Sequence, residues 1–228
     1  MEIDVSLSGD KRAQSDPEGL VQVSVRAEDN VEETLPKIKF LLQPTRSAWL
    51  EQALENLDII LLDHSHCERK AAGVAINLMF RYPAYAKLVR SLTAIAKEEL
   101  EHFEQVNQWL DRRGIDLAPL AAPPYGAKLN GQIRRQEPER LLDMLLVCGL
   151  IEARSHERLG LLAQHLPDLE LGQFYRGLMA SEARHYGIYW LLATTYFDLT
   201  QINQRLLELA SVESEILATL HPEPRIHS

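Results

Sequence analysis

Apolar residues recur every three or four positions along most of the chain beyond residue 44, which is the spacing of one face of an α-helix. Helix-ending signals divide this pattern into segments. Pro83 and Gly114 each close a stripe, and Pro138 suits the first turn of the next one. The pattern predicts five helices, at about residues 45–82, 88–113, 138–166, 169–197 and 201–220.

The links between these helices predict how they pack. The first and second helices, and the third and fourth, are joined by a few residues, whereas residues 116–137 form a long connection with several Pro and Gly and no sustained period. Four long helices with one long crossover favour an all-α, ferritin-like four-helix bundle with an additional C-terminal helix. We expect residues 31–228 to form this single domain and the polar segment 1–30 to be loosely ordered.

Composition narrows the function classes. The 228 residues include 24 Lys and Arg against 33 Asp and Glu, so the formal net charge is −9. This balance argues against a general nucleic-acid binder, because such binding depends on basic side chains that neutralise phosphates. Two cysteines, Cys67 and Cys148, give neither a disulfide framework nor a Cys-x-x-Cys motif. No secretory signal and no uncharged run long enough to span a membrane are visible, so we expect a cytoplasmic protein without a membrane partner.

Six acidic and histidine residues stand where the apolar stripes predict the core. A glutamate in the first predicted helix is followed by a Glu-x-x-His motif in the second, and the third and fourth helices repeat this order. The six residues are Glu68, Glu99, His102, Glu152, Glu182 and His185. The two halves have nearly equal spacing, 31 residues from 68 to 99 and 30 from 152 to 182, which indicates one helical hairpin used twice.

Buried carboxylates at these positions predict a dinuclear metal site in the centre of the bundle. Four clustered carboxylates would repel one another or become protonated unless cations of high charge neutralised them. The same arrangement binds two iron or two manganese ions in carboxylate bundles. Oxygen ligands with two imidazoles suit iron or manganese better than they suit a metal that prefers thiolate ligands. The alternative is a metal-free bundle whose acids lie at a wet helix edge.

Neighbouring residues have weaker predictions. His64, His156 and Tyr189 share the inner faces and are candidates for a second layer around the metals or for a substrate pocket, with core packing as the alternative. Glu98 and Glu101 flank the ligand face by about 100° to either side, which predicts solvated surface. A capping or surface position is predicted for His66.

Five segments of the chain closely resemble the MiaE family of tRNA hydroxylases. They are DHSHCERKAA (63–72), FRYP (80–83), KEELEHFEQV (97–106), IEARSHER (151–158) and SEARHY (181–186), and the likeness extends from about residue 43 to residue 228. The resemblance implies a non-haem di-iron centre held by the same six residues. It also implies dioxygen-dependent hydroxylation of the isopentenyl side chain on 2-methylthio-N6-isopentenyladenosine next to the tRNA anticodon. The implied partners are the tRNA anticodon stem-loop and an electron donor of the ferredoxin or reductase type, because the sequence shows no second redox motif.

Basic residues in and around the crossover predict where RNA binds. Six of them stand between positions 112 and 140 against three acidic residues, a local charge of +3. They are Arg112, Arg113, Lys128, Arg134, Arg135 and Arg140. We expect them to lie at one end of the bundle and to bind the anticodon loop, with a solvated charged loop as the alternative.

Two other function classes stay open on the sequence. A ferritin-like oxidase or peroxidase acting on a small substrate would use the same ligands. A non-catalytic RNA-binding bundle would need neither metal nor dioxygen. Metal content and RNA-dependent hydroxylation distinguish the three possibilities.

Overall fold

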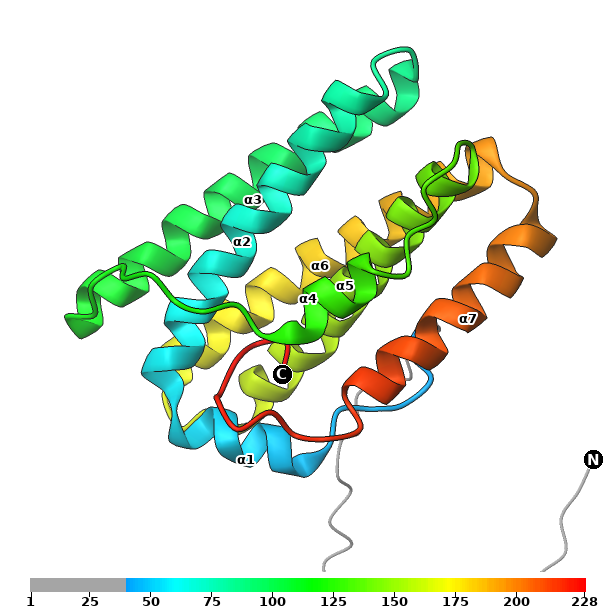
Figure 1. The fold of residues 1–228 in the computed structure, drawn as a ribbon. Coiled ribbons are helices and arrows are strands. Elements are labelled where there is room, and N and C mark those ends of the chain that lie inside the picture. The colour runs from blue at the N-terminus through cyan, green and yellow to red at the C-terminus, as the bar shows by residue number, and fades with distance from the viewer. Residues whose placement is uncertain (1–39) are drawn as a thin grey trace, which may run out of the picture. The chain divides into compact units, whose positions relative to one another are not determined.

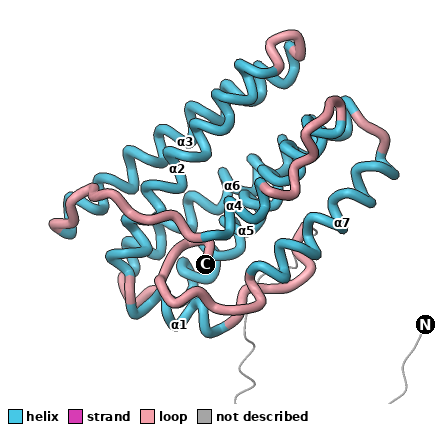
Figure 2. Tube along the Cα trace, viewed as in Figure 1, coloured by secondary structure: helices cyan, strands magenta, loops and turns pink. Residues whose placement is uncertain are grey.

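The computed structural model describes residues 40–228, and these form helices and connecting loops with no strand among them (Figure 1, Figure 2). Within this range the helices are α1 (Ser47–Glu55), α2 (Leu57–Arg81), α3 (Ala86–Arg113), α4 (Pro124–Asn130), α5 (Glu139–His165), α6 (Leu169–Tyr196) and α7 (Leu199–Ile216). The all-α prediction is confirmed, whereas the predicted loose segment 1–30 lies outside the described residues. Of the helices in 40–228, none has the length and hydropathy needed to cross a bilayer.

Two antiparallel hairpins build the bundle. Helix α2 packs along α3, and α5 packs along α6, because each pair is joined by only a few residues (Figure 1). Helix α7 lies against α5 on the outside of the second hairpin. The predicted ferritin-like bundle with an additional C-terminal helix is therefore confirmed.

The core consists of two apolar clusters with a polar layer between them. One cluster contains Leu92 and Leu145, and the other contains Leu61, Val106 and Leu162. Along α2, α3 and α6, the candidate metal ligands fall between the part that enters one cluster and the part that enters the other, and on α5 Glu152 lies near the end of the part that enters the first cluster. Each buried aliphatic side chain stabilises the fold by about 1.5–3 kcal/mol. This packing offsets the cost of burying charged groups in the layer between the clusters.

The predicted single helix over residues 45–82 is wrong, because the chain breaks at Asn56. This residue has φ −130° and ψ 42°, outside the helical region, and its side-chain amide donates to the carbonyl of Gln52 at 2.8 Å. Asn side chains compete with helical backbone hydrogen bonding in this way. As a result α1 turns away from the axis of α2 (Figure 1).

The long crossover contains a helix that the sequence pattern did not reveal. Helix α4 begins with Pro124 in its first turn, where the missing N–H carries no cost, and buries Tyr125 and Leu129. The crossover runs along the bundle from the end of α3 to the distant start of α5 (Figure 1). Its two ends therefore lie at opposite ends of the molecule.

The segment after α7, residues 217–228, returns to the bundle, and its residues 225–228 are buried. Helix α7 stops at Ile216, four residues before the predicted end. Ile226 is 1% exposed, and its backbone N–H donates to the carboxylate of Asp63 at 2.7 Å. The indole of Trp49 donates to the carbonyl of Arg225 at 2.9 Å. The segment thus fastens α1 to α2.

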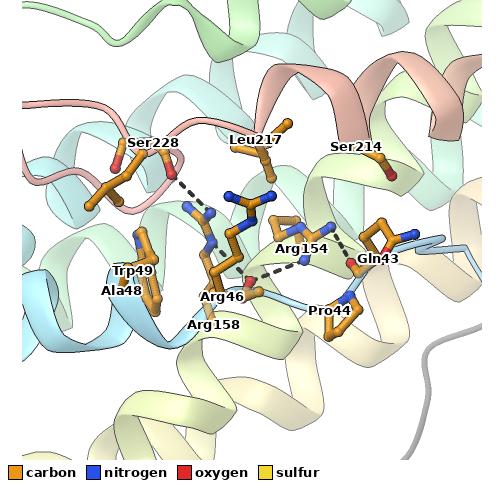
Figure 3. A pocket seen from close by; sticks show the side chains of 13 residues that line it. Gln43, Pro44, Arg46, Ala48, Trp49, Arg154, Arg158, Ser214, Leu217 and Ser228 are labelled. Carbon is orange, nitrogen blue, oxygen red and sulfur yellow. Dashed lines mark hydrogen bonds between the residues drawn. The ribbon is translucent and has the colours of Figure 1, made fainter.

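A cavity of about 270 Å³ lies where this segment meets α1, α5 and α7, and none of the six candidate ligands lines it (Figure 3). Arg154 points into the cavity, but its guanidinium is already bound to the carboxylates of Glu213 and Glu157. Arg158 donates to the backbone oxygens of Ile226 and Ser228. These two arginines therefore hold the chain end and α7 in place.

Candidate metal centre

All six candidate ligands meet in the polar layer, and each is at most 6% exposed. Their ligand atoms form two groups of four, in each of which the atoms lie within 4.8 Å of one another. One group is Glu68, Glu99, His102 and Glu182, and the other is Glu99, Glu152, Glu182 and His185. Glu99 and Glu182 belong to both groups. Two adjacent cation positions that share two carboxylates fit this arrangement.

The ring nitrogens of both histidines face the shared carboxylates. Nδ1 of His185 lies 2.7 Å from Oε1 of Glu99. Nδ1 of His102 lies 3.4 Å from Oε2 of Glu68, 3.7 Å from Oε2 of Glu99 and 4.0 Å from Oε1 of Glu182. Both Nδ1 atoms are buried and have no hydrogen bond of acceptable geometry among the described residues. Lone pairs aimed at a common centre are what a bound cation requires.

Electrostatics in the layer also favour a cation. Burial raises the pKa of Glu152 to about 8, and burial together with the charge of Glu152 raises the pKa of Glu182 well above its usual range. Burial raises the pKa of Glu99 too. Burial would lower the pKa of His102, but its contacts with Glu68 and Glu99 outweigh this and raise that pKa to about 10. The layer holds more negative charge than its histidines balance, and two divalent cations would remove the excess.

His64 lies beside the candidate ligand Glu68 on α2. Its Nε2 lies 2.5 Å from Oε1 of Glu68, one helical turn away. Its ring stacks on Tyr175 of α6, with centroids 5.5 Å apart. The Tyr175 hydroxyl is buried and has no hydrogen-bond partner among residues 40–228. Tyr175 is not among the residues predicted for the site, although it precedes Glu182 by seven residues on the same face.

The other two inner-face candidates lie differently. Tyr189 is 2% exposed, and burial together with the neighbouring Cys148 raises its pKa well above the usual range. It stands one turn beyond His185 along α6, at the edge of the polar layer. His156 donates from Nδ1 to the carbonyl of Met179 at 2.9 Å and belongs to neither ligand group. Its contact thus joins α5 to α6.

The prediction that Glu98 is plain solvated surface is wrong. Its Oε2 lies 3.0 Å from Nε2 of His185, on the ring edge opposite the ligand nitrogen, and accepts from Arg184 at 2.9 Å. A carboxylate on the far nitrogen of a ligand histidine fixes the orientation and tautomer of the ring. Glu98 lies off the ligand face of α3, and its direction on that helix points it at α6. The sequence alone does not show that α6 packs on this side of α3.

The prediction that His66 occupies a capping or surface position is also wrong, since its side chain is buried and only 7% exposed. Its Nε2 donates to the carbonyl of Ala118 at 2.9 Å, and its Nδ1 accepts from Arg69 at 2.9 Å. The contact with Ala118 ties the beginning of the crossover to α2, and Arg69 orients the His66 ring within α2.

The six basic residues of the crossover do not gather at one end of the bundle. Arg112 pairs with Glu170 at 2.7 Å and Arg113 with Asp58 at 2.8 Å, at the end where α2 and α6 begin. Arg134, in contrast, pairs with the buried Asp143 near the start of α5. The two ends are separated by about the length of α2, roughly 37 Å at 1.5 Å per residue. The predicted single basic patch is wrong because the crossover spans the bundle.

A bundle whose paired hairpins each contribute a Glu and a Glu-x-x-His motif to one buried layer belongs to the ferritin-like class of dinuclear carboxylate proteins. Residues 32–228 match the family model described as tRNA-(MS[2]IO[6]A)-hydroxylase (MiaE). The chain belongs to this family of hydroxylases.

Individual relatives agree with this assignment. The chain is 42% identical over 195 residues to tRNA 2-(methylsulfanyl)-N(6)-isopentenyladenosine(37) hydroxylase of Pseudomonas putida, covering 85% of this chain and 95% of that protein. The Salmonella typhimurium protein of the same name is 31% identical over 242 residues, covering 85% of this chain and 89% of the relative. A solved structure, protein 43 with aldehyde deformylating oxygenase activity from Synechococcus, is 49% identical with a TM-score of 0.82, covering 84% of this chain and 96% of that one.

Proposed function

We propose that the six residues bind two iron ions and that the protein hydroxylates the isopentenyl side chain of 2-methylthio-N6-isopentenyladenosine in tRNA, with O2 as co-substrate. The observation that carries this proposal is the pair of ligand groups sharing Glu99 and Glu182 in a member of the MiaE family. The curated relatives are named for this substrate. A tRNA substrate also supports our proposal that the protein acts in the cytoplasm.

The protein's own residues would position the reaction. Glu99 and Glu182 would each contribute to both ion positions. Glu98 would orient the ring of His185, and His64 would orient the carboxylate of Glu68. Bound iron supplies activation of O2 for oxygen insertion into a C–H bond. The apolar clusters on either side of the layer keep bulk water away from the reacting atoms.

The reaction needs an external electron donor. Insertion of one oxygen atom of O2 into a C–H bond reduces the other to water, which consumes two electrons and two protons. The chain has two cysteines, of which Cys148 is buried beside Tyr189, and neither forms a redox pair in the described residues. We infer that a ferredoxin or reductase-type partner supplies the electrons.

The test is hydroxylation of defined RNA. Iron-loaded protein, O2 and a chemical reductant are incubated with tRNA bearing the prenylated nucleoside, and the nucleosides are analysed by mass spectrometry. We expect a product one oxygen atom heavier with wild type and none with Glu182→Ala. An unchanged nucleoside under conditions in which iron is bound would contradict the proposal.

The name of the Synechococcus protein supports a second candidate, oxygenation of an aldehyde at the same centre. Both reactions would use the same ligand set, so the geometry does not separate them. Competition does: offered a medium-chain aldehyde and prenylated tRNA together, a tRNA hydroxylase converts the RNA. Exclusive consumption of the aldehyde would favour the second candidate.

A further inference from the structure

One stretch of the α2–α3 hairpin, residues 69–97, carries positive charge only. Between Glu68 and Glu98 there is no acidic residue, although six basic residues stand there: Arg69, Lys70, Arg81, Lys87, Arg90 and Lys97. The remaining chain carries 18 basic against 33 acidic residues, since 24 − 6 = 18. A segment of charge +6 within a chain of charge −9 marks a surface suited to a polyanion.

This segment forms the distal half of the α2–α3 hairpin, whose turn stands at the end of the bundle away from α1 (Figure 1). Phe80 is 83% exposed at the end of α2, and Tyr85 is 38% exposed in the turn. Arg81 and Arg90 are exposed, and neither forms a salt bridge within residues 40–228. An apolar ring and two unengaged guanidinium groups therefore face solvent together.

The far end of the crossover lies at the same end of the bundle. The hydroxyl of Tyr82 donates to Oε1 of Glu137 at 2.7 Å, which brings residues 134–140 against the hairpin turn. Arg135 in this stretch is exposed and forms no salt bridge among the described residues. Glu137 stands two residues after Arg135 and accepts this hydrogen bond.

We propose that this hairpin-tip surface, consisting of Phe80, Arg81, Tyr85, Arg90 and Arg135, binds the tRNA substrate, and this inference rests on the proposed function. Guanidinium groups match phosphate oxygens, and exposed aromatic rings stack on unpaired bases. The combination of charge and exposed rings favours RNA over a lipid surface or a protein partner.

The tip is too far from the metal layer to hold the modified base itself. From Glu68 to Arg81 the helix rises by about 20 Å at 1.5 Å per residue. The hairpin-tip surface therefore binds nucleotides that flank the prenylated one. It acts through substrate affinity and leaves the chemistry of the metal layer unchanged.

Binding of a synthetic anticodon stem-loop RNA to the full chain, followed by fluorescence anisotropy over a series of salt concentrations, tests the inference. We expect Arg81→Ala and Arg90→Ala each to raise Kd about tenfold and to reduce the salt slope by about one. Phe80→Ala raises Kd about tenfold without changing the slope, because stacking releases no counterions. Arg46→Ala is the control, since Arg46 is exposed and unpaired among the described residues at the other end of the bundle.

The outcomes separate this inference from the proposed function. If wild type binds and hydroxylates RNA while the tip variants bind like Arg46→Ala, the tip assignment is wrong and the hydroxylase proposal stands. If wild type neither binds nor hydroxylates RNA, both fail. A change of oligomeric state in Phe80→Ala, seen by sedimentation, would instead assign the tip to self-association and overturn the RNA assignment.

Discussion

Glu98 offers a sharp test of the metal centre, because it touches no metal position and still restrains a ligand. Its Oε2 lies 3.0 Å from Nε2 of His185. Substitution of such a carboxylate typically lowers metal affinity by about 10–100-fold, or roughly 1.4–2.7 kcal/mol. The Glu98 side chain is 36% exposed, and Arg184 shares its charge, so solvent screening places the expected loss near the lower limit, about tenfold.

Two variants divide this effect into charge and contact. Glu98→Gln keeps an oxygen that can accept from His185 and loses the negative charge, whereas Glu98→Ala loses both. Anaerobic titration of metal-free protein with Fe²⁺ or Co²⁺ gives the affinity and the number of ions bound. We expect two ions per chain in every case and weaker binding in the order wild type, Glu98→Gln, Glu98→Ala.

The matched control is Glu101→Gln, which removes the same charge from an exposed position one turn further along α3. It should bind metal as wild type does. Equal affinities for Glu98→Ala and Glu101→Gln would refute the view that Glu98 holds the His185 ring, and would leave its hydrogen bond without a role in metal binding.

Three further predictions concern the ligands and the buried charges. Glu182→Ala should retain fewer than two ions per chain by elemental analysis after gel filtration, because Glu182 belongs to both ligand groups; full occupancy would contradict a shared ligand. Burial and the charge of Arg158 lower the pKa of His227 to about 3, so its protonation favours the unfolded chain. Its contribution to stability is present above about pH 6.5 and is lost as the pH falls toward 3. In urea titrations, the free energy of unfolding of His227→Asn should therefore depend less on pH over that range than that of wild type. Arg154→Leu should lower the free energy of unfolding by about 3–5 kcal/mol, because it leaves Glu213 buried without its cation; the double variant with Glu213→Leu should recover much of this loss, and an equal loss in both variants would argue against the pair.

The long helices and the burial of the six acidic and histidine residues were predictable because both depend on periodicity. A residue three or four positions from another on a helix shares its face whatever packs against that face, so the burial of Glu99 and His102 could be inferred before any partner helix was known. The break at Asn56 was not predicted, for the same reason. The apolar spacing from Leu54 to Leu57 continues unchanged across it, and only the backbone angles show that the helix has ended.

Contacts between helices were not predictable from one sequence. Glu98 was assigned to solvent from its angle on α3, yet that angle points it at His185 on another helix. The basic residues of the crossover were grouped by their nearness in sequence, while the chain between Arg113 and Arg134 spans the bundle. Helix α4 is too short for its apolar residues to establish a period.

The buried segment at residues 225–228 determines when the fold can be completed during synthesis. Arg225 contacts Trp49 across 176 residues of sequence, and Ile226 contacts Asp63 across 163. Loops of this length close slowly compared with the pairing of neighbouring helices. The two hairpins can form while the ribosome is still translating, but the side of α2 that carries Asp63 and Cys67 stays uncovered until residues 225–228 emerge. A nascent chain therefore exposes the wall beside Glu68 even after both hairpins have formed.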